Sequence, residues 1–133
     1  MDVRELRLGN LVSEFVLGVC PVGGIESDVK NDGIVWLRDN YMRYHIDGDN
    51  IEPIPLTGKW IKKLGFTKIR KGVWCKEYGG WYYQIEKHPS FPEGYILFID
   101  VTGVSAPPSV KIKYVHELQN LYYALTGEEL IIR

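Results

Sequence analysis

The segment from Ile112 to Gly127, IKYVHELQNLYYALTG, most strongly limits how this chain folds, because it is the one long run with a clear helical period. Apolar residues recur along it every three to four positions, which predicts a helix with one wide apolar face. Gly127 is the expected end of this helix, since glycine readily adopts the left-handed conformation that follows many helices. The outward positions are expected to be His116, Glu117, Asn120 and Tyr123.

The composition indicates a folded domain with its own core. With 133 residues, 45% of them apolar and 13% aromatic, the chain fits one domain or two small substructures. The net charge of −1 gives no overall attraction to nucleic acid or to an anionic membrane. The charged N-terminus does not have the pattern of a secretory signal, and no apolar run approaches the length of about 18 residues that a membrane span needs. We therefore expect a cytoplasmic location, with Cys20 and Cys75 as free thiols.

Residues 1–56 are predicted to form a small β-barrel-like substructure. Pro21 to Gly24 is expected to break the chain, because proline and paired glycines favour turns. Asp32-Gly33 is a favoured hairpin turn, and Asp47 to Asn50 is the next one. The predicted strands lie within Leu6 to Cys20, Ile25 to Lys30, Ile34 to Arg38, Tyr41 to Ile46 and Ile51 to Leu56. Short strands at this close spacing are typical of a compact barrel or a strongly curled sheet.

Residues 57–133 are predicted to form an α+β substructure, so that the whole chain is an α+β fold. Thr57 is the expected N-cap of a short helix, Gly58 to Leu64, which ends at Gly65 in a Schellman motif. An antiparallel meander follows, with Gly79-Gly80 as a two-residue hairpin turn. Its strands are Thr67 to Arg70, Val73 to Tyr78, Trp81 to Lys87 and the central Tyr95 to Val101, and a loop, Gly103 to Ser109, leads to the C-terminal helix packed on the sheet.

Three segments carry a resemblance to a known group of proteins: RELRLGNLV at 4–12, IPLTGKWIKKLGF at 54–66 and IKYVHELQNLYYALTGEEL at 112–130. Together they resemble small uncharacterised proteins carried by prophages and conjugative elements of gut Bacteroidetes. The resemblance implies a phage or mobile-element setting and no particular activity. The LRLGNLV opening, followed by Gly18, Gly24 and Ile25, is also similar to the entry strand of Src-homology-3-like small barrels, an analogy of fold alone.

No pattern of catalytic or metal-binding residues is present. His45, His88 and His116 are far apart in the sequence, and none has a second ligand at helical spacing. Asp47 to Asn50, DGDN, favours a tight turn over a calcium loop, since the closing glutamate of that loop is missing. Cys75 alternates within an apparent strand and is expected to be a small core residue. We therefore expect a non-enzymatic protein without metal or cofactor.

A basic stretch is the strongest positive signal for a ligand. Residues 59–76 contain seven Lys or Arg and no Asp or Glu. Combined with the aromatic residues up to Tyr83, this pattern is typical of nucleic-acid binding. The alternative is that the lysines are the solvated face of a short helix and the aromatics are core. The acidic part of the chain, residues 14–52, could also neutralise the stretch. The candidate binding residues are Lys59, Lys62, Lys63, Lys68, Arg70, Lys71, Trp74 and Lys76.

Protein binding is the function that the sequence favours overall. Tyr and Trp are abundant in the chain, and these residues concentrate at the energetic centres of protein interfaces. An exposed Tyr123 or the strand edge at Ile51 to Leu56 would serve an unidentified protein partner or a homodimer. A nucleic-acid-binding accessory factor using residues 59–83 is the alternative. The sequence leaves open whether Trp74, Trp81, Tyr82 and Tyr83 are core or surface.

Overall fold

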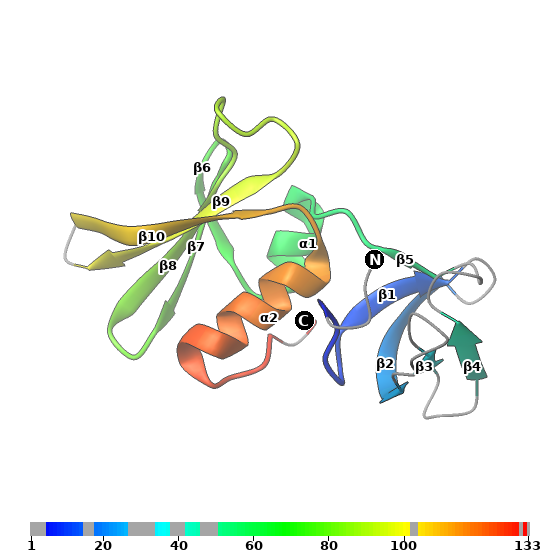
Figure 1. Cartoon of the computed structure of the whole chain (residues 1–133). Coiled ribbons are helices and arrows are strands. Elements are labelled where there is room, and N and C mark those ends of the chain that lie inside the picture. Colours follow the sequence, from blue (N-terminus) through cyan, green and yellow to red (C-terminus); the bar gives the residue numbers. More distant parts are fainter. Residues whose placement is uncertain are drawn as a thin grey trace. The chain divides into compact units, whose positions relative to one another are not determined.

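The protein has an α+β fold, as predicted (Figure 1). This is seen in a computed structural model, which describes residues 5–14, 18–26, 34–37, 42–45, 51–101, 104–130 and 132. The chain divides into two compact units. The first unit comprises Met1–Pro55 with Val115–Leu121, and the second comprises Leu56–Tyr114 with Tyr122–Arg133. Neither of the helices in the described part of the chain is long and apolar enough to cross a membrane.

The first unit is built on antiparallel strands in the order β4-β3-β2-β1-β5. Their bounds are β1 (Leu11–Glu14), β2 (Gly18–Glu26), β3 (Ile34–Leu37), β4 (Met42–His45) and β5 (Ile51–Pro53). The first half of β2 pairs with β1 and its second half with β3. After the meander from β1 to β4, β5 returns to pair with the other edge of β1. Among the described strands no closed barrel is found, so the predicted barrel is not confirmed.

The predicted break from Pro21 to Gly24 is wrong, because β2 runs through all four residues. Pro21 lies opposite Leu11 of β1, and pairing with β3 begins only at Val22, so the missing proline N–H is tolerated where the two ladders meet. The paired glycines are absorbed in a register shift between Val22 and Gly24. The predicted turns at Asp32-Gly33 and Asp47 to Asn50 lie outside the described residues.

The second unit contains a five-stranded antiparallel meander in the order β10-β9-β8-β7-β6. Its strands are β6 (Thr67–Arg70), β7 (Val73–Tyr78), β8 (Trp81–Glu86), β9 (Tyr95–Val101) and β10 (Val104–Ile112). Gly79 and Gly80 make the β7-β8 turn with φ of 61° and 82°, which confirms the predicted hairpin. The predicted loop from Gly103 to Ser109 is wrong, because β10 begins at Val104. An edge position and a register shift between Ala106 and Val110 accommodate the two prolines there.

The short helix α1 (Gly58–Lys63) has the predicted caps at both ends. The Thr57 hydroxyl accepts a hydrogen bond from the Trp60 N–H at 3.3 Å. Gly65 has φ 96°, its N–H donates to the Lys62 carbonyl, and the Phe66 N–H donates to the Ile61 carbonyl. These two bonds are the pattern of a Schellman motif. The caps matter because a helix of six residues has few internal hydrogen bonds.

The C-terminal helix α2 (Val115–Thr126) ends at Gly127, as predicted, with φ 74°. Its start is three residues later than expected, since Ile112 is the last residue of β10. Leu118 and Tyr122 are buried and Tyr123 is exposed, which agrees with the predicted faces. His116 does not agree, because its side chain is only 1% exposed. The helical period alone predicts that His116 is exposed. In the structure it is buried, and its Nε2 lies 3.6 Å from Oε2 of Glu5 in the same unit.

The C-terminal end of α2 is held in the second unit by a cluster of aromatic rings. The Tyr122 ring makes edge-to-face contacts with Phe66 at 6.2 Å and Tyr83 at 5.6 Å between centroids. Trp74 makes a similar contact with Tyr95 at 5.8 Å. Trp74 and Tyr83 are buried, so two of the four aromatics left open by the sequence are core. The other two, Trp81 and Tyr82, are exposed.

Candidate functional site

The residues of the predicted basic stretch lie on α1, β6 and β7 of the second unit. Lysines 59, 62 and 63 are exposed on α1, while Lys68 and Arg70 are exposed on β6, and Lys71 follows in the turn. On β7, Trp74 is buried and Lys76 is half-buried. The structure brings four of the eight residues to one groove, namely Lys59, Lys62, Lys68 and Trp74. The remaining four do not line it.

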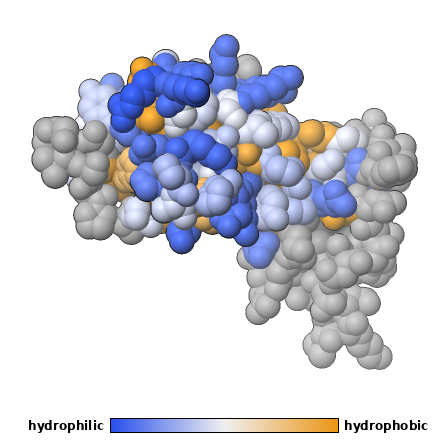
Figure 2. All heavy atoms as spheres, turned by 90° about the horizontal axis from the view of Figure 1, so that it is seen from above, coloured by the Kyte–Doolittle hydropathy of each residue, from blue (hydrophilic) through white to orange (hydrophobic). Residues whose placement is uncertain are grey.

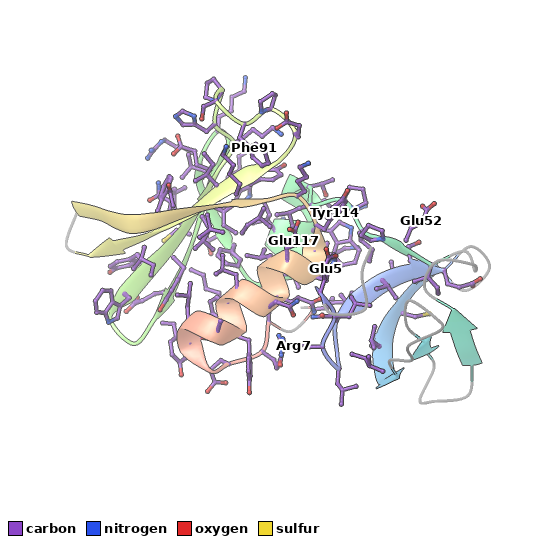
Figure 3. The ribbon with its side chains drawn as sticks, in the orientation of Figure 1. Glu5, Arg7, Glu52, Phe91, Tyr114 and Glu117 are labelled. Atoms are coloured by element: carbon purple, nitrogen blue, oxygen red, sulfur yellow. The ribbon has the colours of Figure 1, made fainter. Side chains whose placement is uncertain are left out.

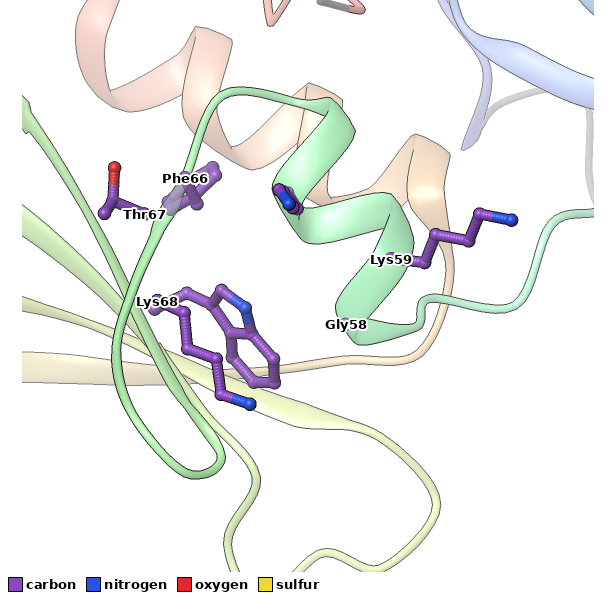
Figure 4. A pocket seen from close by; sticks show the side chains of 7 residues that line it. Gly58, Lys59, Phe66, Thr67 and Lys68 are labelled. Atoms are coloured by element: carbon purple, nitrogen blue, oxygen red, sulfur yellow. The ribbon is translucent and has the colours of Figure 1, made fainter.

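This groove lies between α1 and β6 and has a volume of about 610 Å³ (Figure 4). Its apolar wall is formed by Phe66 and Trp74, which are 2% and 8% exposed. The Lys68 ammonium lies 5.9 Å from the centroid of the Trp74 ring, a cation–π distance. The lining residues are Gly58, Lys59, Lys62, Phe66, Thr67, Lys68 and Trp74. The groove therefore has a cationic rim over an apolar wall.

Gly58 allows α1 to approach the sheet at this groove. A Cβ atom added to it would lie 2.8 Å from Cζ2 of Trp74, closer than carbon atoms tolerate. The absence of a side chain at this position therefore sets the distance between the first turn of α1 and the indole ring. Trp74 is consequently a packed wall residue and offers little ring surface for stacking on a nucleic-acid base.

A second feature is a set of large apolar side chains exposed at the tip of the β7-β8 hairpin and on the last turns of α2. Each is between 37% and 47% exposed. We call this set the aromatic surface, and it consists of Tyr78, Trp81, Tyr82, Tyr123 and Leu125. Tyr78 and Trp81 share one face of the hairpin, and Tyr82 lies on the other face. The clue in the sequence was the position of Tyr78 and Trp81 on either side of the Gly79-Gly80 turn. Aromatics at a hairpin tip extend beyond the covered part of a sheet.

Direct contacts hold the hairpin tip and the helix end together. Tyr78 pairs with Trp81 across the hairpin, and its ring lies 6.4 Å from that of Tyr122 on α2. The Tyr78 hydroxyl donates a hydrogen bond to Oε1 of Glu128 at 3.3 Å. Partial desolvation and the nearby Glu128 carboxylate raise the pKa of Tyr78 above its ordinary value of 10.0. A tyrosine hydroxyl is already protonated at neutral pH, so it can donate to this carboxylate. The arrangement is therefore fixed by contacts within the second unit.

In the first unit, polar side chains of α2 are hydrogen-bonded to the N-terminal segment, where Glu5, Arg7 and Glu117 are labelled in Figure 3. The side-chain oxygen Oδ1 of Asn120 accepts hydrogen bonds from Arg7 Nε and Asn10 Nδ2, both at 2.8 Å. The side-chain oxygen Oε1 of Gln119 accepts a hydrogen bond from the Leu11 N–H at 2.9 Å. These groups satisfy one another and provide no reactive site. The network links residues from two of the segments on which the sequence resemblance rests.

His116 lies beside this network without the surroundings of a metal site. Its Nε2 is 3.6 Å from Oε2 of Glu5, and burial lowers the pKa of the imidazole. No group of three or more His, Cys, Asp or Glu residues that could hold a metal ion is found in the described part of the chain. No disulfide joins Cys20, which is buried, and Cys75, which is half-buried where a core position was expected.

Comparison of the chain with protein-family models, with curated proteins and with solved structures found no match in any of the three. The function is therefore argued from the two surfaces of the second unit, the groove and the aromatic surface. On the face that Figure 2 shows, hydrophilic side chains cover most of the described surface, with smaller apolar areas between them. The aromatic surface contributes five exposed large apolar side chains from β7, β8 and α2, and four others in the described part of the chain, Leu8, Val19, Ile69 and Ile132, lie outside it.

Proposed function

We propose that this protein is a non-enzymatic binding protein that attaches to a protein partner through its aromatic surface. The observation that carries the proposal is the exposure of five large apolar side chains on β7, β8 and α2, namely Tyr78, Trp81, Tyr82, Tyr123 and Leu125. Single exposed apolar residues are common on protein surfaces, whereas a group of them on elements that contact each other, as Tyr78 on β7 and Tyr122 on α2 do, is typical of an interaction site. Tyrosine and tryptophan are also the residues that contribute most to the energy of protein interfaces.

The contacts behind the aromatic surface support this role. Because Tyr78 is held by Tyr122 and Glu128, it loses little side-chain freedom when a partner binds, which reduces the entropic cost of association. Exposed carboxylates lie near the rings in the sequence, with Glu77 on β7 and Glu128 and Glu129 just after the end of α2. The expected partner therefore has an apolar centre with a neutral or basic rim.

The proposal also covers the origin and location of the protein and the fold type of its first unit. The resemblance of the three sequence segments supports a phage or mobile-element accessory protein that acts in the cytoplasm. The order β4-β3-β2-β1-β5, with β5 returning to β1, supports a first unit of the Src-homology-3-like type. That likeness concerns fold and does not itself assign a partner.

The test compares wild-type protein with a Trp81→Ser, Tyr123→Ser variant. Sedimentation velocity over a range of concentrations measures self-association, and affinity capture from a host extract measures heterologous binding. We expect one of these associations in the wild type and its loss in the variant. Leu8→Ser, which removes an exposed apolar residue from the first unit, is the matched control and should retain binding. A wild type that neither self-associates nor captures a partner would rule the function out.

Nucleic-acid binding through residues 59–83 is the second candidate, favoured by the three lysines that line one groove. Phosphate contacts make such binding strongly dependent on salt. Anisotropy of labelled single- and double-stranded DNA should then show binding at about 50 mM salt that weakens steeply by about 200 mM. Absence of binding at the lower salt concentration would eliminate this candidate.

A further inference from the structure

We propose that the groove between α1 and β6 binds an extended, acidic peptide segment of a partner protein, which adds as a strand to the free edge of β6. This site is separate from the aromatic surface, so it extends the proposed function and does not depend on it. Three features of the second unit lead to this occupant: an open strand edge, a cationic rim and an apolar wall.

The strand edge comes from the sheet order, which places β6 at one end. β6 pairs with β7 on one side only, and within the described part of the chain no strand lies on its other side. All four of its residues, Thr67 to Arg70, are exposed. An edge of this kind presents backbone N–H and C=O groups to solvent, and these can pair with an added strand.

The groove supplies the side-chain chemistry beside that edge. Lys68 lies opposite Trp74 in the β6-β7 pair and both line the groove, together with Lys59 and Lys62 from α1 (Figure 4). Since side chains of a strand alternate between its two faces, every second residue of an added strand would face the groove. Acidic residues at those positions would meet the positive charge of Lys62 and Lys68, whereas the Lys59 side chain extends away from Lys68 (Figure 4). No Asp or Glu lines the groove, so its charge selects an anionic occupant.

The apolar wall favours a peptide over a nucleic acid. Sites for single-stranded nucleic acid combine positive charge with exposed rings on which bases stack. Here the two aromatic wall residues, Phe66 and Trp74, are almost completely buried, so the rings can pack against aliphatic carbon but offer no stacking face. The stem of an acidic side chain fits such a wall, because it is apolar up to its carboxylate.

The test uses fluorescein-labelled short peptides of alternating Glu and Val, with anisotropy measured at about 150 mM salt so that distant charges are screened. Wild-type protein should bind this peptide. Lys62→Glu should weaken binding about tenfold or more, since it places a like charge in the groove. Lys63→Glu is the matched control, because it makes the same charge change on the neighbouring residue of α1, which does not line the groove. It should change the affinity by less than about threefold.

Strand addition is tested by backbone N-methylation. In an alternating peptide the N–H groups of all Glu residues point to one edge and those of all Val residues to the other. One of the two N-methylated peptides should therefore lose binding while the other retains it, and a peptide of alternating Lys and Val should not bind. Equal binding by both methylated peptides, or by the Lys62→Glu and wild-type proteins, would overturn the proposal.

Two further outcomes would also overturn it. Binding of a labelled oligothymidylate but not of the acidic peptide would assign the groove to nucleic acid. Binding of neither would leave the β6 cations as charges that protect an edge strand from aggregation. The Trp81→Ser, Tyr123→Ser variant should bind the acidic peptide like the wild type, so failure at this groove is distinguishable from failure of the aromatic surface.

Discussion

At the scale of single residues, His116 makes the first unit sensitive to acid. Burial lowers the pKa of its imidazole below the ordinary value of 6.5, while the carboxylates of Glu117 and Glu5 act in the opposite direction. The unfolded chain therefore takes up this proton at a higher pH than the folded protein does. Stability is fully present above about pH 7 and is lost as the pH falls through 6.5 towards the lowered pKa.

Urea unfolding of the wild type and of His116→Gln at about pH 7.5 and 5.5 measures this contribution. The wild type should lose more stability between the two pH values than the variant does, because only the wild type carries the imidazole. The comparison of slopes removes the effect of carboxylates that both proteins share. Parallel pH dependences would mean that His116 does not titrate differently in the folded and unfolded states.

Gln119 makes a buried polar contact with the N-terminal segment. It is buried, and its Oε1 accepts the hydrogen bond of the Leu11 N–H, which is also buried. Gln119→Ala would leave that N–H without an acceptor, at a cost of about 1–3 kcal/mol in the free energy of unfolding. Chemical denaturation measures the loss. Glu93→Gln, a change at an exposed position, should stay within about 0.5 kcal/mol of the wild type.

At the scale of elements, replacing Gly58 of α1 with alanine would have two opposite effects on stability, one through helix propensity and one through packing. Alanine in place of glycine favours a helix by about 1 kcal/mol. Here the added methyl group would lie 2.8 Å from the Trp74 ring, and overpacking of this kind costs about 1–3 kcal/mol. We expect Gly58→Ala to lower the melting temperature, whereas Lys63→Ala, on the exposed side of the same helix, should leave it nearly unchanged. A more stable Gly58→Ala protein would show that α1 moves away from the sheet easily.

The elements also show what could be predicted from the sequence. The caps of α1, the Gly79-Gly80 hairpin and the end of α2 were predicted correctly, because each depends on residues a few positions apart. The strand through Pro21 to Gly24 and the start of β10 were missed, since their turn-forming residues are held in strands by distant partners. The burial of His116 was missed for the same reason.

The groove and the aromatic surface could also be predicted only in part from the sequence. The charge of the basic stretch was visible in the sequence, but the groove arises from the packing of α1 against β6, which brings Lys59 and Lys62 to one groove with Lys68. The aromatic surface required the pairing of the β7-β8 tip with Glu128 after α2. The sequence therefore shows which charged and aromatic residues are present. Tertiary contacts determine which of their side chains lie side by side.

At the scale of the whole molecule, α2 is the element that contributes to both units, with Val115–Leu121 in the first and the residues from Tyr122 onward in the second. Because a helix forms cooperatively, loss of its first turns should also destabilise its last turns. We therefore expect one unfolding transition, with coincident midpoints by circular dichroism and by tryptophan fluorescence.

Leu118 is completely buried, so Leu118→Ala should lower the free energy of unfolding by about 2–5 kcal/mol with both probes. Leu125→Ala, at an exposed position of the same helix, should cost less than about 1 kcal/mol. Two separate transitions, of which Leu118→Ala shifts only one, would show that the units unfold independently and that α2 does not couple them.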